Sequence, residues 1–405
     1  MSSKSIEELA QQGAVPPSDF NQHIERIVEV AKDQVILPED IEAKIDAVTD
    51  RFAIGRDTIS SAVYSLLNGH LILQGPPGTG KSSLARAICE VVFNVNIATA
   101  TAHPEWSVFD VIGRQELRIN EQGQEEIIPV NGNVVQSIID CAGQIVKNED
   151  DPTQAQAVWL IIDELNRCEI DRAFGELFTA IGTDDLIPIA LSHQRKGNSL
   201  MVVPKRYRII ATLNTIDKRF VNELSQALKR RFSFITLDIP SAPVDKDDPI
   251  GSSEELKREY QIVATQSMNG AKNRLNIQLS QIDNDTLYEH ISLVIKNLYK
   301  LVTIVRYPED DGIFLPIGTA QLIDTIELYL VRSLSTNSIS EVNLTQINLQ
   351  LLDWATSIKI VPLFDIDTVG YQEIIQFAEN LANPFNGLTR RELLRSANAG
   401  RSYVQ

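Results

Sequence analysis

The sequence LILQGPPGTGKSS, residues 71–83, holds the pattern GxxxxGK[ST] between a short apolar run and the helical pattern LARAICEVV. In such a loop the glycines let backbone N–H groups approach a polyphosphate closely, and the helix that follows presents its positive N-terminus. The pattern predicts that Lys81 contacts the β and γ phosphates of a nucleotide and that the Ser82 hydroxyl binds Mg²⁺. The predicted phosphate-binding loop comprises Gly75, Pro76, Pro77, Gly78, Thr79, Gly80, Lys81, Ser82 and Ser83.

Two adjacent carboxylates follow a second apolar run, in AVWLIIDELNR at residues 157–167. Ligands of open α/β sheets bind at the carboxyl ends of the strands. Asp163 is therefore predicted to hold Mg²⁺, directly or through water, and Glu164 to orient and deprotonate an attacking water. An acidic pair after a strand is common by itself, but its place downstream of the phosphate loop favours the catalytic interpretation.

A third apolar run, in RIIATLNTID at residues 208–217, ends in Asn214. A polar side chain at that edge of the sheet reaches the same crevice, so Asn214 is predicted to hydrogen-bond the attacking water or the γ phosphate. The alternative is an asparagine that ends a strand through turn chemistry. Its position after two matched motifs favours the functional interpretation.

A basic cluster ends the helical pattern in LSQALKRRFSFITL, residues 224–237. Cations near a helix C-terminus favour the helix dipole, and a solvated cluster is the ordinary explanation. In a motor that assembles into a ring, however, Arg230 or Arg231 would reach the γ phosphate of a neighbouring subunit and stabilise charge in the transition state. The sequence leaves open which of the two arginines does so.

Short apolar runs alternate with helical patterns between residues 65 and 242, at 71–73, 158–162, 208–213 and 234–237. Runs that are apolar on both faces suit buried strands of a parallel α/β sheet. We therefore divide the chain into a helical N-terminal segment (1–64), a nucleotide-binding core (65–242), and a helical lid with a C-terminal extension (243–405). The Pro/Asp/Ser-rich stretch 239–253 is predicted to link the last two parts.

Two further stretches of the core are predicted to be β-hairpins that project from the sheet. They are 119–130, with Gly123 at a turn, and 186–203, with a polar tip that contains glycine. Such hairpins could contact a macromolecular partner, and the alternative is that they only decorate the sheet.

The composition restricts the function classes. The 405 residues are 43% hydrophobic, and 37 Lys+Arg against 54 Asp+Glu give a net charge of −17, which does not favour a general nucleic-acid coat. Three cysteines (Cys89, Cys141 and Cys168) without CxxC spacing indicate reduced thiols and a cytoplasmic location. No apolar run has the length of a signal peptide or a membrane span, so we expect no membrane association.

With GPPGTGKS, IIDELNR, ATLNT and ALKRRFSF in this order, the chain resembles AAA+ ATPases. More narrowly, it resembles the branch that contains MoxR-type chaperones, dynein-related ATPases and the McrB motor of modification-dependent restriction. NGHLILQGPPGTGKS is similar to the MoxR type, whereas IIDELNRCEIDRAFGELFTAI and ALKRRFSFI are closer to McrB. The resemblance covers residues 65–240 well and the helical remainder weakly.

The resemblance implies a five-stranded parallel core with a phosphate loop and β-hairpin insertions, a small helical lid, and a hexameric ring with nucleotide at the subunit boundaries. Asn166 and Arg167 match the NR that follows the acids, with a role in sensing the interface. Gln321 stands near the place of a sensor 2 arginine, so lid sensing is altered or supplied by another residue. The implied roles are Walker A for Lys81 and Ser82, Walker B for Asp163 and Glu164, sensor 1 for Asn214, and arginine finger for Arg230 or Arg231.

The leading hypothesis is a cytoplasmic, Mg²⁺-dependent ATP hydrolase, an AAA+ ring motor or chaperone that remodels or translocates a protein client or works through an adaptor. One alternative is a McrB-like GTP-driven DNA translocase that serves a separate nuclease. The other is a nucleotide-gated scaffold with negligible turnover, against which the intact Glu164 and the arginine pair argue. ATP is the default nucleotide, and the sequence does not locate a pocket that reads the base.

Overall fold

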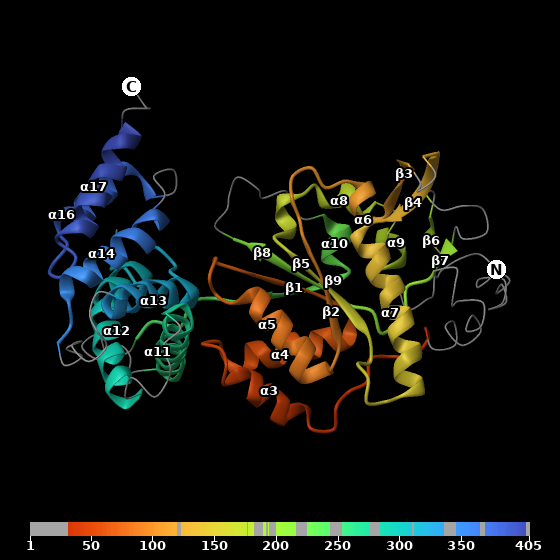
Figure 1. Ribbon diagram of the computed structural model, residues 1–405, viewed down its shortest axis with the longest axis horizontal. Helices are drawn as coiled ribbons and strands as arrows, with labels where there is room; N and C mark the ends of the chain where they lie inside the picture. Colours follow the sequence, from red (N-terminus) through yellow and green to blue (C-terminus); the bar gives the residue numbers. More distant parts are fainter. Residues whose placement is uncertain are drawn as a thin grey trace. The chain divides into compact units, whose positions relative to one another are not determined.

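The computed structural model describes residues 31–119, 123–175, 177–181, 189–191, 193, 200–215, 225–243, 253–275, 284–309, 312–335, 346–364 and 369–401. These residues form two compact units (Figure 1). The first unit comprises the described residues up to Thr49, together with Arg56–Gly75 and Lys81–Leu237. The second comprises Asp50–Gly55, Pro76–Gly80 and the described residues from Asp238 onward.

A parallel sheet of five strands forms the centre of the first unit, in the order β2-β5-β8-β1-β9. The side chains of Leu71, Ile72 and Leu73 are fully buried, which explains why β1 has an apolar run without alternation. The predicted α/β core with a parallel sheet is thus confirmed. The strands are β1 (His70–Gly75), β2 (Asn96–Thr101), β5 (Val158–Asp163), β8 (Ile209–Asn214) and β9 (Phe232–Thr236).

The edge strand β2 is the one strand of this sheet that the apolar runs do not reveal. Its sequence, NIATAT, is short and rich in Ala and Thr, and its side chains are exposed or half-buried. Its strand conformation comes from parallel pairing with β5, from Asn96 opposite Val158 to Thr101 opposite Asp163. That pairing joins segments far apart in the chain, so local composition could not predict it.

Helices pack against this sheet, as Figure 1 shows: α4 contacts β1 and β9, α5 contacts β1, β5 and β8, and α7 contacts β5. The helical pattern LARAICEVV is α5 followed by a π-helix, η2, which ends at Asn94 in a left-handed conformation. The predicted helical segment 1–64 contains α3 and most of α4, and its residues 1–30 lie outside the described residues. The helices are α3 (Ile41–Thr49), α4 (Arg56–Asn68), α5 (Lys81–Ala87), η2 (Ile88–Phe93), α6 (Val108–Val111), α7 (Asn133–Asp150), η3 (Leu165–Arg167), α8 (Ile170–Phe174), α9 (Leu177–Ala180) and α10 (Gln226–Lys229).

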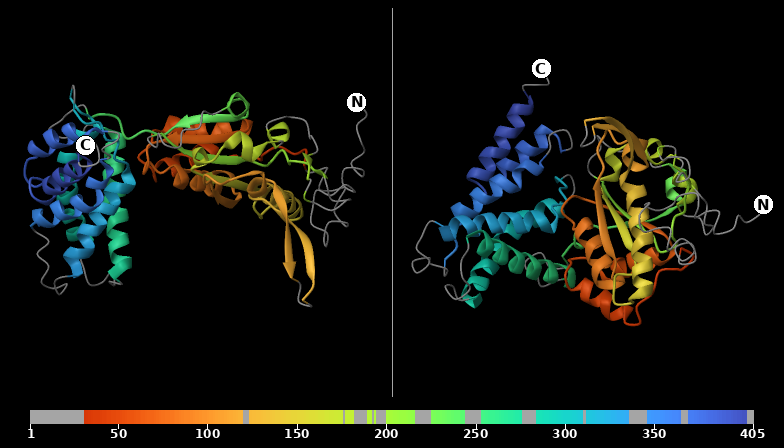
Figure 2. Two further views of the ribbon diagram at one scale, coloured as in Figure 1. Left: turned by 90° about the horizontal axis from the view of Figure 1, so that it is seen from above. Right: turned by 45° about the vertical axis from the view of Figure 1, so that its right-hand side comes forward.

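Two antiparallel strand pairs accompany the sheet. β3 (Gly113–Ile119) and β4 (Glu125–Asn131) form a hairpin that stands out from the first unit, as Figure 2 shows. The prediction placed this hairpin at 119–130, which was wrong for its first strand, because GRQELRI is largely polar and most of its side chains are exposed. In the predicted hairpin 186–203, β6 (Ile189–Ala190) pairs with β7 (Leu200–Met201), and most of the tip lies outside the described residues.

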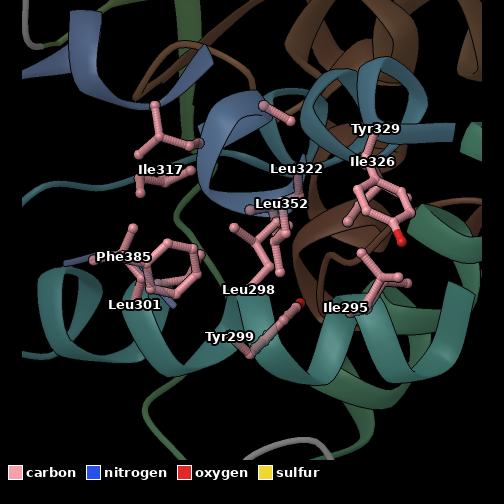
Figure 3. Packing of buried hydrophobic residues seen from close by; sticks show 14 of the residues in the cluster. Ile295, Leu298, Tyr299, Leu301, Ile317, Leu322, Ile326, Tyr329, Leu352 and Phe385 are labelled. Atoms are coloured by element: carbon pink, nitrogen blue, oxygen red, sulfur yellow. The ribbon is translucent and has the colours of Figure 1, made fainter. Parts of the chain in front are cut away.

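The second unit is helical. Its core, shown in Figure 3, packs Leu298 of α12 near Leu322 of α13 and Leu352 of α14. Leu322 and Ile326, one helical turn apart on α13, are both fully buried. Most of the predicted linker, residues 244–252, lies outside the described residues. The helices are α11 (Glu254–Leu275), α12 (Asn284–Arg306), α13 (Thr319–Ser335), α14 (Leu349–Lys359), η7 (Val361–Leu363), α16 (Tyr371–Glu379) and α17 (Leu388–Arg401).

A buried ion pair joins three elements of the second unit. Arg306 of α12 donates two hydrogen bonds to the Glu259 carboxylate of α11, at 2.7 and 2.8 Å, and neither side chain is exposed. Tyr299 and Thr319 donate to the same carboxylate, at 2.5 and 2.7 Å. Burial alone would raise the pKa of Glu259, but the charge of Arg306 and these hydrogen bonds outweigh it and hold this pKa below its usual value. The contacts orient the start of α13.

Candidate nucleotide-binding site

The phosphate loop connects β1 to α5 through three glycines with positive φ. Gly75 has φ +151°, and a Cβ atom there would lie 2.0 Å from the carbonyl oxygen of Leu237. Gly78 and Gly80 have φ +79° and +84°, which L side chains rarely adopt. The loop therefore needs glycine at these positions for its shape, which agrees with the close approach predicted from the motif.

Lys81 is the first residue of α5, and its side chain is buried, with 7% exposed. Its Nζ donates a hydrogen bond to the carbonyl oxygen of Gly75 at 2.9 Å. Burial lowers the pKa of Lys81 to about 8, against the opposing effect of the negative charges of Glu164 and Asp163. The ammonium group thus lies beside the carboxyl end of β1, where a phosphate would relieve its desolvation.

Ser82 of α5 contacts Asp163 at the carboxyl end of β5. The Ser82 hydroxyl donates to Asp163 Oδ1 at 2.5 Å, and the Thr212 hydroxyl donates to the same oxygen at 3.2 Å. Hydroxyl and carboxylate oxygens are the hard ligands that Mg²⁺ prefers, together with phosphate oxygens. This donor pair therefore fits the Mg²⁺ ion that the motifs imply.

Glu164 directly precedes η3 and has a left-handed conformation, φ 57°, which is costly for a residue other than glycine. Its backbone N–H donates to the Thr212 hydroxyl at 3.0 Å. Two side chains hold its carboxylate: Asn214 Nδ2 donates to Oε1 at 3.1 Å, and Arg167 contacts Oε2 through Nε at 2.7 Å and Oε1 through Nη2 at 3.2 Å. The strained backbone thus directs the Glu164 carboxylate toward the end of the neighbouring strand β8.

The carboxyl ends of β1 and β8 lie side by side, because Asn214 is opposite Gly75 in the parallel register. Asn166 is attached to Asn214 by two hydrogen bonds, from Asn166 Nδ2 to the Asn214 carbonyl at 3.3 Å and from the Asn214 N–H to Asn166 Oδ1 at 3.5 Å. The structure therefore brings Asn166 and Arg167, which only the family resemblance had indicated, into the same cluster as Glu164.

Thr212 is a member of this cluster that the sequence interpretation missed. It is 3% exposed in the middle of β8 and contacts both acidic residues through one hydroxyl. The available signal was a single hydroxyl in an otherwise apolar strand, IIATLN. Because a buried polar side chain needs a partner, that signal could have marked it.

Arg230 and Arg231, the two candidates for the arginine finger, lie apart from the cluster around Lys81 and Glu164. Both precede β9 and so lie at the amino-terminal edge of the sheet, whereas Lys81 lies just beyond the carboxyl end of β1. Six residues of β1 at about 3.3 Å each separate the two edges by roughly 20 Å. The structure therefore does not bring Arg230 or Arg231 together with the other predicted site residues of the same chain.

Arg231 and Arg230 differ in their contacts. Arg231 donates to the carbonyl oxygens of Ile181 and Ala227, at 3.0 and 2.8 Å, and its guanidinium lies 5.7 Å from the Phe178 ring centre. Arg230 is exposed, and its side chain has no hydrogen-bond or ion-pair partner among the described residues. Among the described residues, the Arg230 guanidinium thus has no partner, whereas Arg231 has already used Nε and Nη1.

Gln321, in the second unit, lies in the first turns of α13 beside the tip of the loop. Its Nε2 donates to the Pro77 carbonyl at 3.4 Å, and the backbone N–H of Ala320 donates to the Gly78 carbonyl at 3.1 Å. An uncharged side chain thus occupies the place beside the loop where the resemblance implies an arginine.

Comparison with known proteins identifies the class of this site. Residues 70–232 match the AAA domain of the dynein-related subfamily, which confirms the AAA+ resemblance drawn from the motifs. A domain of this class binds a nucleotide, and its general activity is nucleotide hydrolysis.

Similar proteins cover part of the chain. The type IV methyl-directed restriction enzyme EcoKMcrB subunit of Escherichia coli K12 is 28% identical over 201 residues, which are 48% of this chain and 40% of that subunit. An uncharacterized protein of Staphylococcus haemolyticus is 25% identical over 189 residues, 45% of this chain and 60% of that protein. The chain thus spans about half the length of the curated relatives it matches.

Among solved structures, a RuvB mutant of Thermotoga maritima is similar over 82% of this chain and 79% of that chain, with 13% sequence identity and a TM-score of 0.40.

None of the described helices combines the length and the apolar composition that crossing a membrane requires.

Proposed function

We propose that this protein is a Mg²⁺-dependent ATP hydrolase that works as a ring-forming motor or chaperone on a macromolecular client. The observation that carries the proposal is the cluster at the carboxyl edge of the sheet. There the Ser82–Asp163 contact and the Glu164–Asn214 contact lie next to a loop shaped for phosphates. A cytoplasmic location and the division into 1–64, 65–242 and 243–405 are parts of the same proposal.

The roles follow from the contacts. Lys81 and the backbone N–H groups of the loop bind the phosphates, and Ser82 and Asp163 hold Mg²⁺, which offsets phosphate charge when bound. Glu164 accepts the proton of the attacking water, and Asn214 keeps its carboxylate oriented. Arg167 pairs with Oε2 of Glu164 at 2.7 Å. The attacking water must therefore bind to Oε2 alongside Arg167 or displace it.

The arginine finger is assigned to Arg230, acting in trans. The distance between the two edges of the sheet prevents Arg230 from reaching the γ phosphate bound by its own chain. Arg231 is held by carbonyl oxygens of its own chain, whereas Arg230 has no partner among the described residues. A ring in which the amino-terminal edge of one subunit faces the phosphate loop of the next satisfies these constraints.

Turnover of ATP and of GTP by the purified chain tests the proposal, with Glu164→Gln as the control. Glu164→Gln is expected to bind nucleotide but to hydrolyse it about 100-fold or more slowly, because the general base is lost. If wild type hydrolyses both ATP and GTP as slowly as Glu164→Gln does, hydrolysis is wrong and the nucleotide-gated scaffold replaces it.

Mixing experiments test the finger. Glu164→Gln chains mixed with Arg230→Ala chains are expected to recover turnover, because some boundaries then combine an intact Glu164 with an intact Arg230. The same mixture with Arg231→Ala in place of Arg230→Ala serves as the comparison. No recovery at any ratio would exclude a finger that acts in trans from Arg230.

The second candidate is a GTP-driven DNA translocase that serves a separate nuclease, and the similarity to the McrB subunit favours it. It predicts faster turnover of GTP than of ATP and stimulation by double-stranded DNA. The ATP motor predicts the opposite nucleotide preference and stimulation by a protein client instead.

A further inference from the structure

A polar cavity of about 310 Å³ opens in the first unit, at the edge of the sheet opposite the phosphate loop. Its lining includes the residues that precede β1, β8 and β9, so it lies at the amino-terminal ends of three neighbouring strands. None of the roles assigned so far uses the cavity as a whole, although Arg230 and Arg231 belong to its wall.

The wall of this cavity is strongly positive. Four cationic residues line it, namely Lys205, Arg208, Arg230 and Arg231, and no Asp or Glu is among the described lining residues. The chain as a whole carries a net charge of −17, so this concentration of cations runs against the overall charge. Asp33, which lies near the cavity residue Gln34 in the sequence, is paired with Arg206 at 3.4 Å.

Arg208 contributes charge rather than free donors. It is 6% exposed, and its guanidinium donates to the carbonyl oxygens of Leu66 and Leu67 at 2.5 and 3.1 Å, and to two more carbonyls of its own segment. Burial lowers the pKa of Arg208 to about 10, so it remains charged at neutral pH. All the hydrogen-bond partners of Arg208 among the described residues are carbonyl oxygens, so no carboxylate balances this buried cation there and the cavity favours an anion.

Lys205 and Arg230 supply the free donors. Neither side chain has a hydrogen-bond or ion-pair partner among the described residues, although both line the cavity. Arg231 uses Nε and Nη1 for carbonyl oxygens, which leaves Nη2 for a ligand. A lysine point charge beside two guanidinium groups is a donor set suited to the several oxygens of a phosphate group.

We propose that this cavity binds a phosphate group and that Lys205 is one of its ligands. Two sources share this chemistry: a small phosphate-bearing anion from solution, or the triphosphate tail held by a second copy of this chain. The second source rests on the proposed function, in which Arg230 acts on a neighbour's nucleotide. The first source does not depend on hydrolysis.

Titration calorimetry with pyrophosphate tests the first source, on the full chain carrying Lys81→Ala so that the phosphate loop does not compete. We expect one site whose affinity falls about tenfold or more when Lys205→Ala is added, because a charge-assisted hydrogen bond is lost. Lys229→Ala is the matched control, since Lys229 is an exposed neighbour that does not line the cavity. Lys205→Gln, which removes the charge but keeps a polar, somewhat shorter side chain, and thermal unfolding of each variant guard against misfolding.

Assembly tests the second source. With Lys81 intact and a nonhydrolysable ATP analogue present, sedimentation should show that Lys205→Ala needs a roughly tenfold higher protein concentration than Lys229→Ala to form the same oligomer.

An effect in the first experiment assigns the free anion, and an effect in the second assigns the neighbour's phosphate. If Lys205→Ala behaves like Lys229→Ala in both, the cavity is not a phosphate site. Pyrophosphate binding by a chain that fails to hydrolyse nucleotide would separate this inference from the proposed function.

Discussion

Asn214 Nδ2 donates a hydrogen bond to Glu164 Oε1 at 3.1 Å, joining the ends of two adjacent parallel strands, β8 and β5. The two residues are separated by a long stretch of chain, yet the sheet places them in one cluster. Arg167 contacts both carboxylate oxygens, Oε2 at 2.7 Å and Oε1 at 3.2 Å, so the orientation of Glu164 depends on side chains from two elements, η3 and β8. This relationship makes Asn214 a positioning residue whose removal should affect turnover more than binding.

Asn214→Ala is expected to reduce nucleotide turnover by about 100-fold, because Glu164 then keeps only Arg167 of the two side chains that orient its carboxylate. Nucleotide affinity should change by less than about threefold, since Asn214 contacts the carboxylate rather than the phosphate loop. Steady-state turnover and equilibrium binding of a nonhydrolysable analogue measure the two quantities. An equal loss of affinity and turnover would contradict the positioning role.

Ser82→Ala should weaken the dependence of nucleotide binding on Mg²⁺, because the hydroxyl at 2.5 Å from Asp163 Oδ1 is a predicted ligand of the ion. The affinity for Mg²⁺–ATP is expected to fall about tenfold, while the weak affinity for ATP without Mg²⁺ stays the same. Ser61→Ala, which changes an exposed serine of α4 outside the phosphate loop, is the matched control. Identical Mg²⁺ titrations of the two variants would remove Ser82 from the metal site.

Nucleotide affinity should depend on pH through Lys81. Burial lowers the pKa of this amine to about 8 in the folded chain, and a bound phosphate stabilises the protonated form. Binding above pH 8 therefore takes up a proton, so affinity is level below pH 8 and falls by up to about tenfold per pH unit above it. Binding of a nonhydrolysable ATP analogue from pH 7 to 9.5 checks this.

Lys81→Ala is the control for that titration and should bind weakly without the same break near pH 8. A wild-type affinity that stays level through pH 9.5 would show that the Lys81 ammonium is not the group on which binding depends.

Gly75→Ala should destabilise the first unit and distort the phosphate loop. The added methyl group would lie 2.0 Å from the carbonyl oxygen of Leu237, and φ at this position is +151°. We expect a loss of about 2–4 kcal/mol in the free energy of unfolding, from overpacking together with backbone strain. Gly143→Ala, in the interior of α7 with nothing within 4 Å of an added Cβ, should instead stabilise by about 0.5–1 kcal/mol. Denaturant unfolding of both variants tests the contrast.

Glu259→Gln should destabilise the second unit, because it leaves the buried Arg306 guanidinium without its counter-charge. The expected loss is about 3–5 kcal/mol. Glu254→Gln removes an exposed partner of Lys257 and should cost less than about 0.5 kcal/mol. Denaturant unfolding of the two variants supplies the comparison, and similar small losses would show that the buried pair is not needed.

The phosphate loop, the acidic pair and Asn214 could be predicted from short segments, because each combines an apolar strand with the residue that directly follows it. The contribution of Thr212 could not, since a hydroxyl in the middle of a strand is meaningful only when the neighbouring strand is known. The same limit applies to β2, whose Ala/Thr sequence lacks a strong local preference and whose conformation comes from pairing with β5.

Local chemistry was thus enough to establish a P-loop domain, because glycines at a tight turn and a lysine at a helix start act through neighbouring backbone groups. Tertiary structure alone showed how Arg167 and Asn214 share the Glu164 carboxylate and that the two arginines lie at the far edge of the sheet. It also gathered Lys205 and Arg208 with those arginines around one cavity. The physical reason is strand order: parallel pairing brings together residues that are distant in the chain, and no local pattern contains that order.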